Sequence, residues 1–273
     1  MNRNYYEIRV FGLKRTGNHA IINWIAEMAS KAFNEPTYFL NSCGSRKADP
    51  FKTHADRGDK KGTEIDNIFV QLPNMSKWKK DEIKPIRLKQ KKCLLYSYED
   101  FIITHMLKDD CVRNREYTIG SSDHIFNIII MRDIFNWMAS VIKAQTGSGR
   151  TLPKVDYLLH RWKIYAQCYI NKVIFPPGKT IYILFNKWFL YETYRRNIAK
   201  RLNLEYCDQS LKYVGAPRER GSSFDGMKYE KYADQMDVLN RWKLFNHNPI
   251  LFECIDDEAI IASNIIFGRI YDG

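Results

Sequence analysis

Closely spaced cysteines, the pattern behind disulfide frameworks and zinc sites, are missing from this sequence. Its six cysteines are scattered along 273 residues and form no CxxC pair. Disulfide-rich scaffolds and structural zinc sites both need closer spacing. We therefore expect reduced thiols, no metal site and a cytoplasmic location.

Long hydrophobic runs are missing as well. No stretch approaches the roughly 18 apolar residues that a membrane-spanning helix needs. Residues 1–20 lack the apolar core of a signal peptide. The sequence also contains no internal repeat and no low-complexity linker. We therefore expect one domain over residues 1–273, with no membrane span.

Acidic residues are in short supply. The chain has 31 Asp and Glu against 43 Lys and Arg, which gives a net charge of +12 at pH 7. With 45% hydrophobic residues it has enough apolar side chain to bury a core, which excludes a disordered chain. The positive surplus predicts an anionic partner. Nucleic acid, a membrane surface, a nucleotide and an acidic glycan all fit that description.

Strand and helix signals alternate along the chain, which is typical of an α/β fold with a largely parallel sheet. The β-rich runs predict strands over four ranges, namely 6–11, 93–98, 125–131 and 180–185. The helical spacing of apolar residues predicts helices over four more, namely 18–33, 134–144, 155–173 and 190–202.

Residues 41–92 form a polar stretch broken by glycines and prolines, for which we expect irregular structure. Within it, residues 77–92 carry eight Lys or Arg and two acidic residues, a net charge of +6 and half of the surplus. We call residues 77–92 the basic segment. A charge run is usually a solvated face, and a docking surface for an anionic acceptor is the sharper alternative.

A phosphate-binding pattern lies between the first strand and the first helix. Gly12 and Gly17 have the GxxxxG spacing of a loop whose N–H groups point at an anion together with the helix N-terminus. A Walker A loop continues with Lys and Ser or Thr, whereas this chain continues with Asn18 and His19. An ordinary ATPase or kinase is therefore disfavoured. The cations lie inside the loop, which favours binding of an anion without a metal.

Two further elements carry cations in positions that suit an anion. The strand at 125–131 leads into Arg132, and Ser140 follows eight residues later on the next helix. Both can reach one phosphate at the crevice where α/β sheets bind ligands. Near the C-terminus, a basic and glycine-rich loop contains Arg220 and Gly221. Three anion-binding elements therefore follow one another along the chain.

In this order, the three elements resemble those of the sulfotransferases that use 3′-phosphoadenosine 5′-phosphosulfate (PAPS). The five residues similar to the family's 5′-phosphosulfate loop are Arg15, Thr16, Gly17, Asn18 and His19. Many members have Lys at the first of these positions and Thr at the last. The resemblance implies a three-layer, P-loop-like sulfotransferase fold with a variable insertion at about residues 41–92. It also implies PAPS as cofactor, adenosine 3′,5′-bisphosphate as product and no metal.

The resemblance assigns roles to the other two elements. It implies that Arg132 and Ser140 bind the 3′-phosphate of the cofactor. It implies that Arg220, Gly221 and Ser222 close over the same phosphate. These residues would form the second half of the cofactor site.

Two more features near the C-terminus are similar to the family. Phe224 corresponds to an aromatic residue that meets the adenine in family members. The triplet Arg241-Trp242-Lys243 also looks like a family feature, and we assign it a packing role.

Sulfuryl transfer needs in-line attack on sulfur and stabilisation of the negative charge that builds on the leaving oxygen. The resemblance implies that Arg15, with Lys14 and the loop amides, provides this stabilisation. A base must also take the proton of the acceptor. The family places it at the end of the strand before the 3′-phosphate strand, which makes Glu99 our first candidate. His105 on the following segment is the second, and His54 in a Lys-Thr-His triplet is the third.

We expect a glycan or another hydroxyl compound as the acceptor, with a small alcohol or phenol as the alternative to a saccharide. A P-loop kinase or a non-catalytic nucleotide-binding protein would share the fold. A nucleic-acid-binding protein would explain the charge, but the basic segment is not interleaved with aromatic residues and no helix-turn-helix or RNA-recognition signature occurs. We therefore expect no nucleic acid as partner. The sequence leaves the oligomeric state open.

Overall fold

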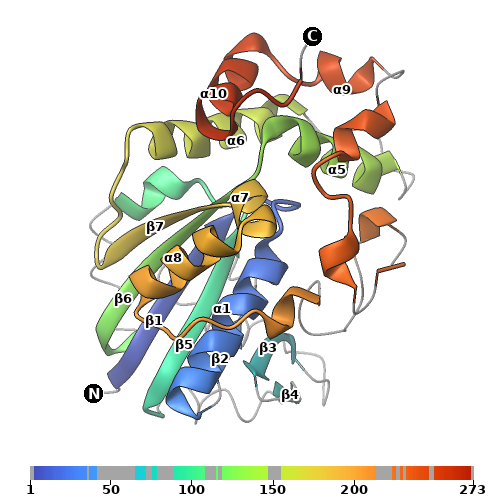
Figure 1. Cartoon of the computed structure of the whole chain (residues 1–273). Helices are drawn as coiled ribbons and strands as arrows, with labels where there is room; N and C mark the ends of the chain where they lie inside the picture. Colours follow the sequence, from blue (N-terminus) through green and yellow to red (C-terminus); the bar gives the residue numbers. More distant parts are fainter. Residues whose placement is uncertain are drawn as a thin grey trace.

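The centre of the computed structural model is a sheet in the order β4-β3-β2-β5-β1-β6-β7 (Figure 1). The structure describes residues 3–35, 37–41, 65–71, 76–78, 89–107, 115, 119–146, 155–212, 223–225, 228–229, 232–245 and 249–271. The strands are β1 (Arg3–Gly12), β2 (Thr37–Leu40), β3 (Ile65–Gln71), β4 (Ser76–Trp78), β5 (Lys91–Glu99), β6 (Ser121–Met131) and β7 (Lys179–Leu184).

The five strands β2, β5, β1, β6 and β7 run parallel to one another. At one edge β3 pairs antiparallel with β2, and β4 pairs antiparallel with β3. This arrangement confirms the predicted α/β fold with a mostly parallel sheet. The four predicted strands correspond to β1, β5, β6 and β7, although Phe185 starts a helix instead of ending β7.

The prediction of irregular structure over residues 41–92 is wrong for part of that range. Strands β3 and β4 lie within it and extend the sheet beyond β2. The run Ile65–Gln71 is rich in Ile, Phe and Val, which favour a pleated strand, and pairing with β2 satisfies backbone groups along one side. The charged and glycine-containing sequence around it masks this signal.

Helices cover both faces of the sheet, so the molecule has three layers (Figure 1). On one face lie α1 (Asn18–Phe33), α7 (Phe185–Leu190) and α8 (Glu192–Leu202). On the other lie α5 (Ile134–Thr146), α6 (Val155–Ile170), α10 (Asp257–Phe267) and the 3₁₀ helix η1 (Ile103–Leu107). The remaining short helices are η2 (Gln209–Lys212), η3 (Ser223–Asp225), η4 (Ala233–Gln235), η5 (Arg241–Phe245) and α9 (Ile250–Glu253).

The predicted helix over 190–202 corresponds to α8, and a further short helix, α7, precedes it. Tyr191 is extended, with φ −113° and ψ 114°, and separates α7 from α8. Its N–H closes α7 by donating to Lys187 O, and its carbonyl accepts from the N–H of Arg195 in α8. This corner lets α7 leave the end of β7 while α8 returns along the sheet (Figure 1). The predicted start at Leu190 lies at the end of α7, and α7 itself was not predicted.

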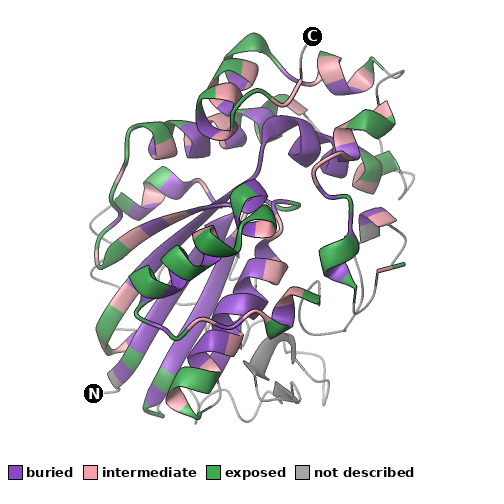
Figure 2. Cartoon of the chain, in the orientation of Figure 1, coloured by how far each residue is buried: buried purple, intermediate pink, exposed green. Residues whose placement is uncertain are grey.

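The core lies on both sides of the parallel strands, which are buried along most of their length (Figure 2). In β1, Ile8 and Val10 pack toward α1, whereas Phe11 packs toward the opposite helices. Register pairs Gly12 with Glu99 of β5 and with a residue near the end of β6, so three strands end side by side. Their carboxyl ends form the edge of the sheet where α/β proteins bind ligands.

Of the helices that the structure describes, none combines the length and apolar character needed to cross a membrane.

Candidate functional site at the carboxyl edge of the sheet

In the glycine loop, residues 12–17, Thr16 turns its side chain inward, as does Asn18 directly after the loop. Thr16 is buried, and its Oγ1 lies 2.6 Å from both Leu13 O and Asn18 Oδ1. Asn18 is also buried and donates from Nδ2 to Leu13 O at 3.1 Å. These side chains therefore hold the shape of the loop. Besides the exposed Lys14 and Arg15, the groups of the loop that can face an anion are backbone N–H groups.

The start of α1 is built to receive negative charge. Gly17 has φ 89°, and a Cβ added there would lie 2.2 Å from the ring of Phe185. No side chain caps the helix, and its first turn contains no acidic residue. The first N–H groups of a helix have no intrahelical partner, and the helix dipole makes this end positive. A bound anion would satisfy both conditions.

Lys14 anchors the glycine loop to the end of β5. Its Nζ lies 3.0 Å from Asp100 Oδ2, and its backbone N–H donates to Asp100 Oδ1 at 2.8 Å. From α5, Trp137 Nε1 donates to Lys14 O at 2.8 Å. The sequence predicts that Lys14 shares charge stabilisation with Arg15. In the structure both side chains are exposed, and the Lys14 ammonium is paired with Asp100.

Arg132 joins the glycine loop to two other segments. Its guanidinium is 1% exposed, and Nη1 donates to Arg15 O and to Ser140 Oγ, both at 3.2 Å. Nη2 donates to the carbonyl of Val238. The Nε atom has no hydrogen-bond partner among the described residues. Arg132 and Ser140, predicted to meet at one phosphate, therefore lie in direct contact.

The turn that carries Arg132 is fixed from several sides. Asp133 caps α5 by accepting the N–H of Asn136 at 2.9 Å. Its second oxygen accepts from Asn186 Nδ2, at the start of α7, at 2.8 Å. The indole of Trp162 donates to Arg132 O at 2.9 Å. These bonds hold the backbone so that the arginine side chain can extend only along the edge of the sheet.

Arg241 contacts the Ser140 hydroxyl, as Arg132 does, whereas we predicted a packing role for it from the sequence. Its Nη1 donates to Ser140 Oγ at 3.4 Å, and its Nη2 lies 2.6 Å from Asp225 Oδ2. Two guanidinium groups therefore converge on one serine. The sequence signal was present, because Arg241 is a cation in a short segment after the third predicted element, but nothing in the pattern showed where that segment folds.

A neighbouring arginine makes the charged form of Arg132, and likewise that of Arg241, less favourable. Burial and the nearby charge of Arg241 lower the pKa of Arg132 to about 9, so Arg132 is still a cation at pH 7. Burial lowers the pKa of Arg241 too, and the charge of Arg15 acts in the same direction. A shift of this kind means that the protein itself disfavours the positive charges. An anion placed among the three arginines would relieve that cost.

Phe224 lies between two cations beside this cluster. The Arg241 guanidinium is 4.2 Å from the centre of the Phe224 ring, and Lys143 Nζ is also 4.2 Å from it. Such contacts are typical of cation–π interactions. The ring predicted to meet adenine therefore supports Arg241 in this structure.

A second polar cluster forms at the ends of β2 and β5. The Nε2 atom of His19 lies 3.3 Å from Asn41 Oδ1 and 3.9 Å from Glu99 Oε1. Ser97 Oγ donates to the same Asn41 oxygen at 3.3 Å. The structure therefore brings together Glu99, the first candidate base, and His19, a candidate cofactor residue. Asn41 was not among the predicted site residues. The strand before it, β2, has four residues and is too short to be recognised from the sequence, so the position at its carboxyl end could not be located.

The other predicted site residues either make no described contact with these two clusters or lie outside the described residues. His105 lies on η1, with its ring edge-on to Phe101 and 6.1 Å between the ring centres. Four predicted residues lie outside the described residues, namely His54, Arg220, Gly221 and Ser222. Most of the basic segment lies outside them as well. Within the described ranges, no group of three or more His, Cys, Asp or Glu could hold a metal ion.

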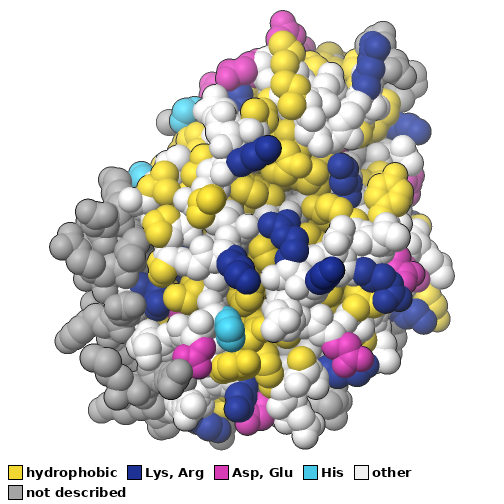
Figure 3. Space-filling view, turned by 60° about the vertical axis from the view of Figure 1, so that its left-hand side comes forward, with side chains coloured by type: hydrophobic (Ala, Val, Ile, Leu, Met, Phe, Trp, Pro, Cys, Tyr) yellow, Lys and Arg dark blue, Asp and Glu magenta, His cyan; other side chains and the backbone are white. Residues whose placement is uncertain are grey.

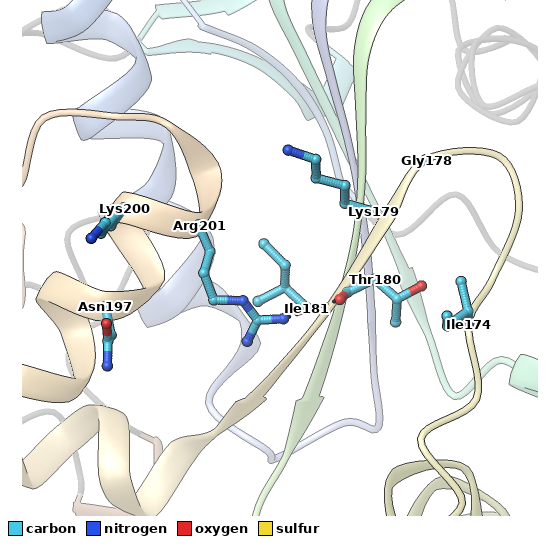
Figure 4. A pocket seen from close by; sticks show the side chains of 8 residues that line it. All are labelled: Ile174, Gly178, Lys179, Thr180, Ile181, Asn197, Lys200 and Arg201. Carbon is cyan, nitrogen blue, oxygen red and sulfur yellow. Dashed lines mark hydrogen bonds between the residues drawn. The ribbon is translucent and has the colours of Figure 1, made fainter.

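A groove of about 760 Å³ lies along β7, away from the glycine loop (Figure 4). Lys179, Lys200 and Arg201 line the groove. On the face of the molecule drawn in Figure 3, Lys and Arg side chains gather near the middle of the view. Arg201 Nη2 donates to Thr180 O at 3.2 Å. Because β7 is an edge strand, this bond occupies an exposed carbonyl, and we assign Arg201 a role in protecting the edge.

Comparison with known proteins gives the fold of this chain a name. It is similar to the sulfotransferase domain of the Synechococcus PCC 7002 olefin synthase, with a TM-score of 0.53, 10% identity, and 100% and 97% of the two chains covered. The sulfotransferase domain of the curacin biosynthetic pathway matches with a TM-score of 0.47 and 10% identity, over 95% of this chain and 96% of that one.

A sugar kinase from Janibacter sp. HTCC2649 matches with a TM-score of 0.32 and 12% identity, over 80% of this chain and 100% of that one. No family model and no curated protein matches the sequence. The likeness to the olefin synthase domain shows that the chain has a sulfotransferase fold, as the sequence predicts.

Proposed function

We propose that this protein transfers a sulfuryl group from PAPS to a hydroxyl of an acceptor. One observation carries the proposal. Arg15, Arg132 and Arg241 are electrostatic neighbours at the carboxyl edge of the sheet, beside a helix N-terminus without a capping side chain. Such a cluster of cations is suited to a ligand that carries several negative charges. PAPS has that chemistry.

The residues present fit the two anionic ends of PAPS. Arg132, Arg241 and Ser140 would hold the 3′-phosphate, because two guanidinium groups and a hydroxyl meet there. The N–H groups at the start of α1 and the side chain of Arg15 would hold the 5′-phosphosulfate. The unpartnered Nε of Arg132 gives the phosphate site a donor that no described residue uses.

When bound, PAPS supplies an activated sulfuryl group and a bisphosphate leaving group. The chain's own contribution is to hold charge in place. Arg15 and the first-turn amides would stabilise the negative charge that builds on the leaving oxygen, and preorganised donors of this kind are worth about 10²- to 10³-fold in rate. Lys14 and Thr16 act indirectly by fixing the loop that presents those amides.

We propose a saccharide hydroxyl as the acceptor, with a small alcohol or phenol as the competing choice. The surplus of +12 supports an anionic partner and therefore an acidic glycan. The basic segment would then help to dock it.

We also place the protein in the reducing environment of the cytoplasm. Four cysteines in the described ranges, Cys93, Cys168, Cys207 and Cys254, are free thiols. Burial raises the pKa of Cys93 to about 12, which makes that thiol unreactive.

The proposal is tested by incubating the purified protein with PAPS and a panel of glycans, alcohols and phenols. The expected result is release of adenosine 3′,5′-bisphosphate together with a gain of one sulfuryl group on an acceptor. Calorimetry with the bisphosphate alone tests the donor site without an acceptor. If neither PAPS nor the bisphosphate binds, the proposed function is wrong.

A further inference from the structure

His19 stands at the junction of the donor and acceptor sides of the site. It is the second residue of α1, directly after the glycine loop, and its ring points to the end of β5. The side chain is 40% exposed, whereas that of Glu99 is 18% exposed. An incoming acceptor therefore meets the imidazole more readily than the carboxylate behind it.

The neighbours of His19 select one tautomer of its ring. Nε2 faces two oxygens, Asn41 Oδ1 at 3.3 Å and Glu99 Oε1 at 3.9 Å. Neither oxygen can donate a proton while Glu99 is ionised, so the ring proton belongs on Nε2. Nδ1 then carries the lone pair, and it has no hydrogen-bond partner among the described residues. A neutral imidazole held in this way is a proton acceptor.

A carboxylate lies beside the ring of His19. Glu99 is the charged group within ion-pair distance of the ring among the described residues. Asn41 and Ser97 are neutral, and Lys14 is paired with Asp100. The carboxylate is therefore placed to orient the imidazole ring. This is the role that a carboxylate plays when it orients a catalytic histidine.

We propose that His19 is the general base of the transfer reaction and that Glu99 and Asn41 are positioning residues. The inference rests on the proposed function. The acceptor hydroxyl gives its proton to Nδ1 of His19, and the acceptor oxygen forms a bond to sulfur. The bond from sulfur to the bridging oxygen breaks, and its electron pair leaves with the bisphosphate. His19 then releases the proton to solvent through its exposed side.

A simpler role for His19 is that of a cation that binds the donor. That role requires a protonated ring and gives no function to the Nε2–H tautomer. It also predicts weaker bisphosphate binding when His19 is replaced. The two roles therefore differ in the state of the ring in the free protein and in the effect on donor affinity.

The first experiment uses the full chain without any ligand. Long-range nitrogen–proton NMR spectra of the isotope-labelled imidazoles are expected to show the Nε2–H tautomer for His19 when the ring is neutral. Glu99→Gln and Asn41→Ala should each reduce that tautomer preference, while a variant at the exposed His160 of α6 should not. The Nδ1–H tautomer in the wild-type protein would overturn the proposal. This readout holds even if the protein binds no PAPS.

The second experiment measures turnover and binding in the same variants. His19→Gln should lower kcat by about 10²- to 10⁴-fold, the usual contribution of a general base, and should remove the acid limb of the pH profile. The Kd for adenosine bisphosphate should stay within about twofold of the wild-type value. His160→Gln is the matched control. Unchanged kcat in His19→Gln, or a collapse of bisphosphate affinity, contradicts the role of base.

Glu99→Gln separates positioning from catalysis. It should lower kcat less than His19→Gln does and should keep an acid limb, because the imidazole is still present. A loss as large as that of His19→Gln, with the acid limb gone, would make Glu99 the base. If neither the wild-type protein nor any variant binds the bisphosphate, the proposed function has failed, and the tautomer of His19 still tests its role.

Discussion

Two buried clusters of charge lie at different levels along the same strands, and their surroundings differ. In the lower half of the sheet, Glu7 is fully buried and accepts from Tyr96 OH at 2.5 Å and from Ser122 Oγ at 2.6 Å. Arg115 Nη1 lies 3.1 Å from its second oxygen. Arg9 beside it donates to the carbonyls at 176 and 177.

At the carboxyl end, about 17 Å further along β1, the charged side chains have different surroundings. Arg132 and Arg241 converge on Ser140, and Asp225 is the carboxylate that pairs with Arg241. Burial lowers the pKa of both arginines, and a neighbouring cation adds to each shift, Arg241 for Arg132 and Arg15 for Arg241. Each cluster holds two arginines and one carboxylate in an ion pair, but the upper one also lies beside the uncapped start of α1, where an anion could bind. The difference separates charges that serve the fold from charges that we assign to a ligand.

The largest effect should come from removing the carboxylate of the lower cluster. Glu7→Ala leaves Arg115 buried without its partner, which typically costs about 3 to 5 kcal/mol in the free energy of unfolding. Bisphosphate affinity of the folded fraction should not change. Denaturant titration and calorimetry measure the two quantities. Glu258→Ala is the control, because Glu258 pairs with Lys163 at the surface and should cost less than about 1 kcal/mol.

The next effect concerns the exposed arginine of the glycine loop. Arg15→Ala should lower kcat by about 10²- to 10³-fold, since it removes a donor to the developing charge. The melting temperature should hardly move, because the side chain is exposed. Steady-state kinetics and thermal unfolding test both statements. Full activity in Arg15→Ala would remove the residue from the mechanism.

A smaller effect is expected where the upper cluster is weakened. Arg132→Met should reduce bisphosphate affinity by about 10- to 100-fold, because it removes charge-assisted hydrogen bonds to the 3′-phosphate. The free energy of unfolding should change by less than about 1 kcal/mol, since the desolvation cost of the cation offsets its hydrogen bonds. Calorimetry and urea titration check this. A loss of stability like that of Glu7→Ala, with affinity intact, would make Arg132 a structural residue.

The smallest effect concerns a buried cation to which we assign no ligand. Burial and the charge of Lys89 lower the pKa of Lys91 to about 8. Between pH 8 and the usual lysine range the unfolded chain binds more protons, so the free energy of unfolding should rise with pH there. Lys91→Met should flatten that rise and stabilise the protein by about 1 kcal/mol at pH 7. A rise that persists in Lys91→Met would assign it to another group.

Much of the fold could be predicted because its signals are local. The strands β1 and β6 are continuous β-rich runs, and α1 and α5 have clear apolar spacing, so each appeared at nearly the right place. Strands β2 and β3 were missed because short apolar runs are ambiguous without their partners. Helix α10 was not predicted, because its apolar residues lie on more than one side and so show no helical period.

The candidate site was predictable only in part, for a physical reason. Spacing located Arg132 and Ser140, because both lie within one strand–helix unit. It could not show that Thr16 turns inward, since that depends on the shape of the glycine loop. It also could not place Arg241 on Ser140 or Asn41 on His19, because those contacts join segments far apart in the chain.

The most direct test of the account is a calorimetric titration of the wild-type protein with adenosine 3′,5′-bisphosphate and, separately, with adenosine 5′-monophosphate. The account predicts one bisphosphate site per chain and at least about tenfold weaker binding of the monophosphate, since a charge-assisted contact is worth about 1.5 to 3 kcal/mol. Arg132→Met should lose that preference. Equal affinity for the two nucleotides, or no binding of either, would contradict the assignment of the arginine cluster to the 3′-phosphate.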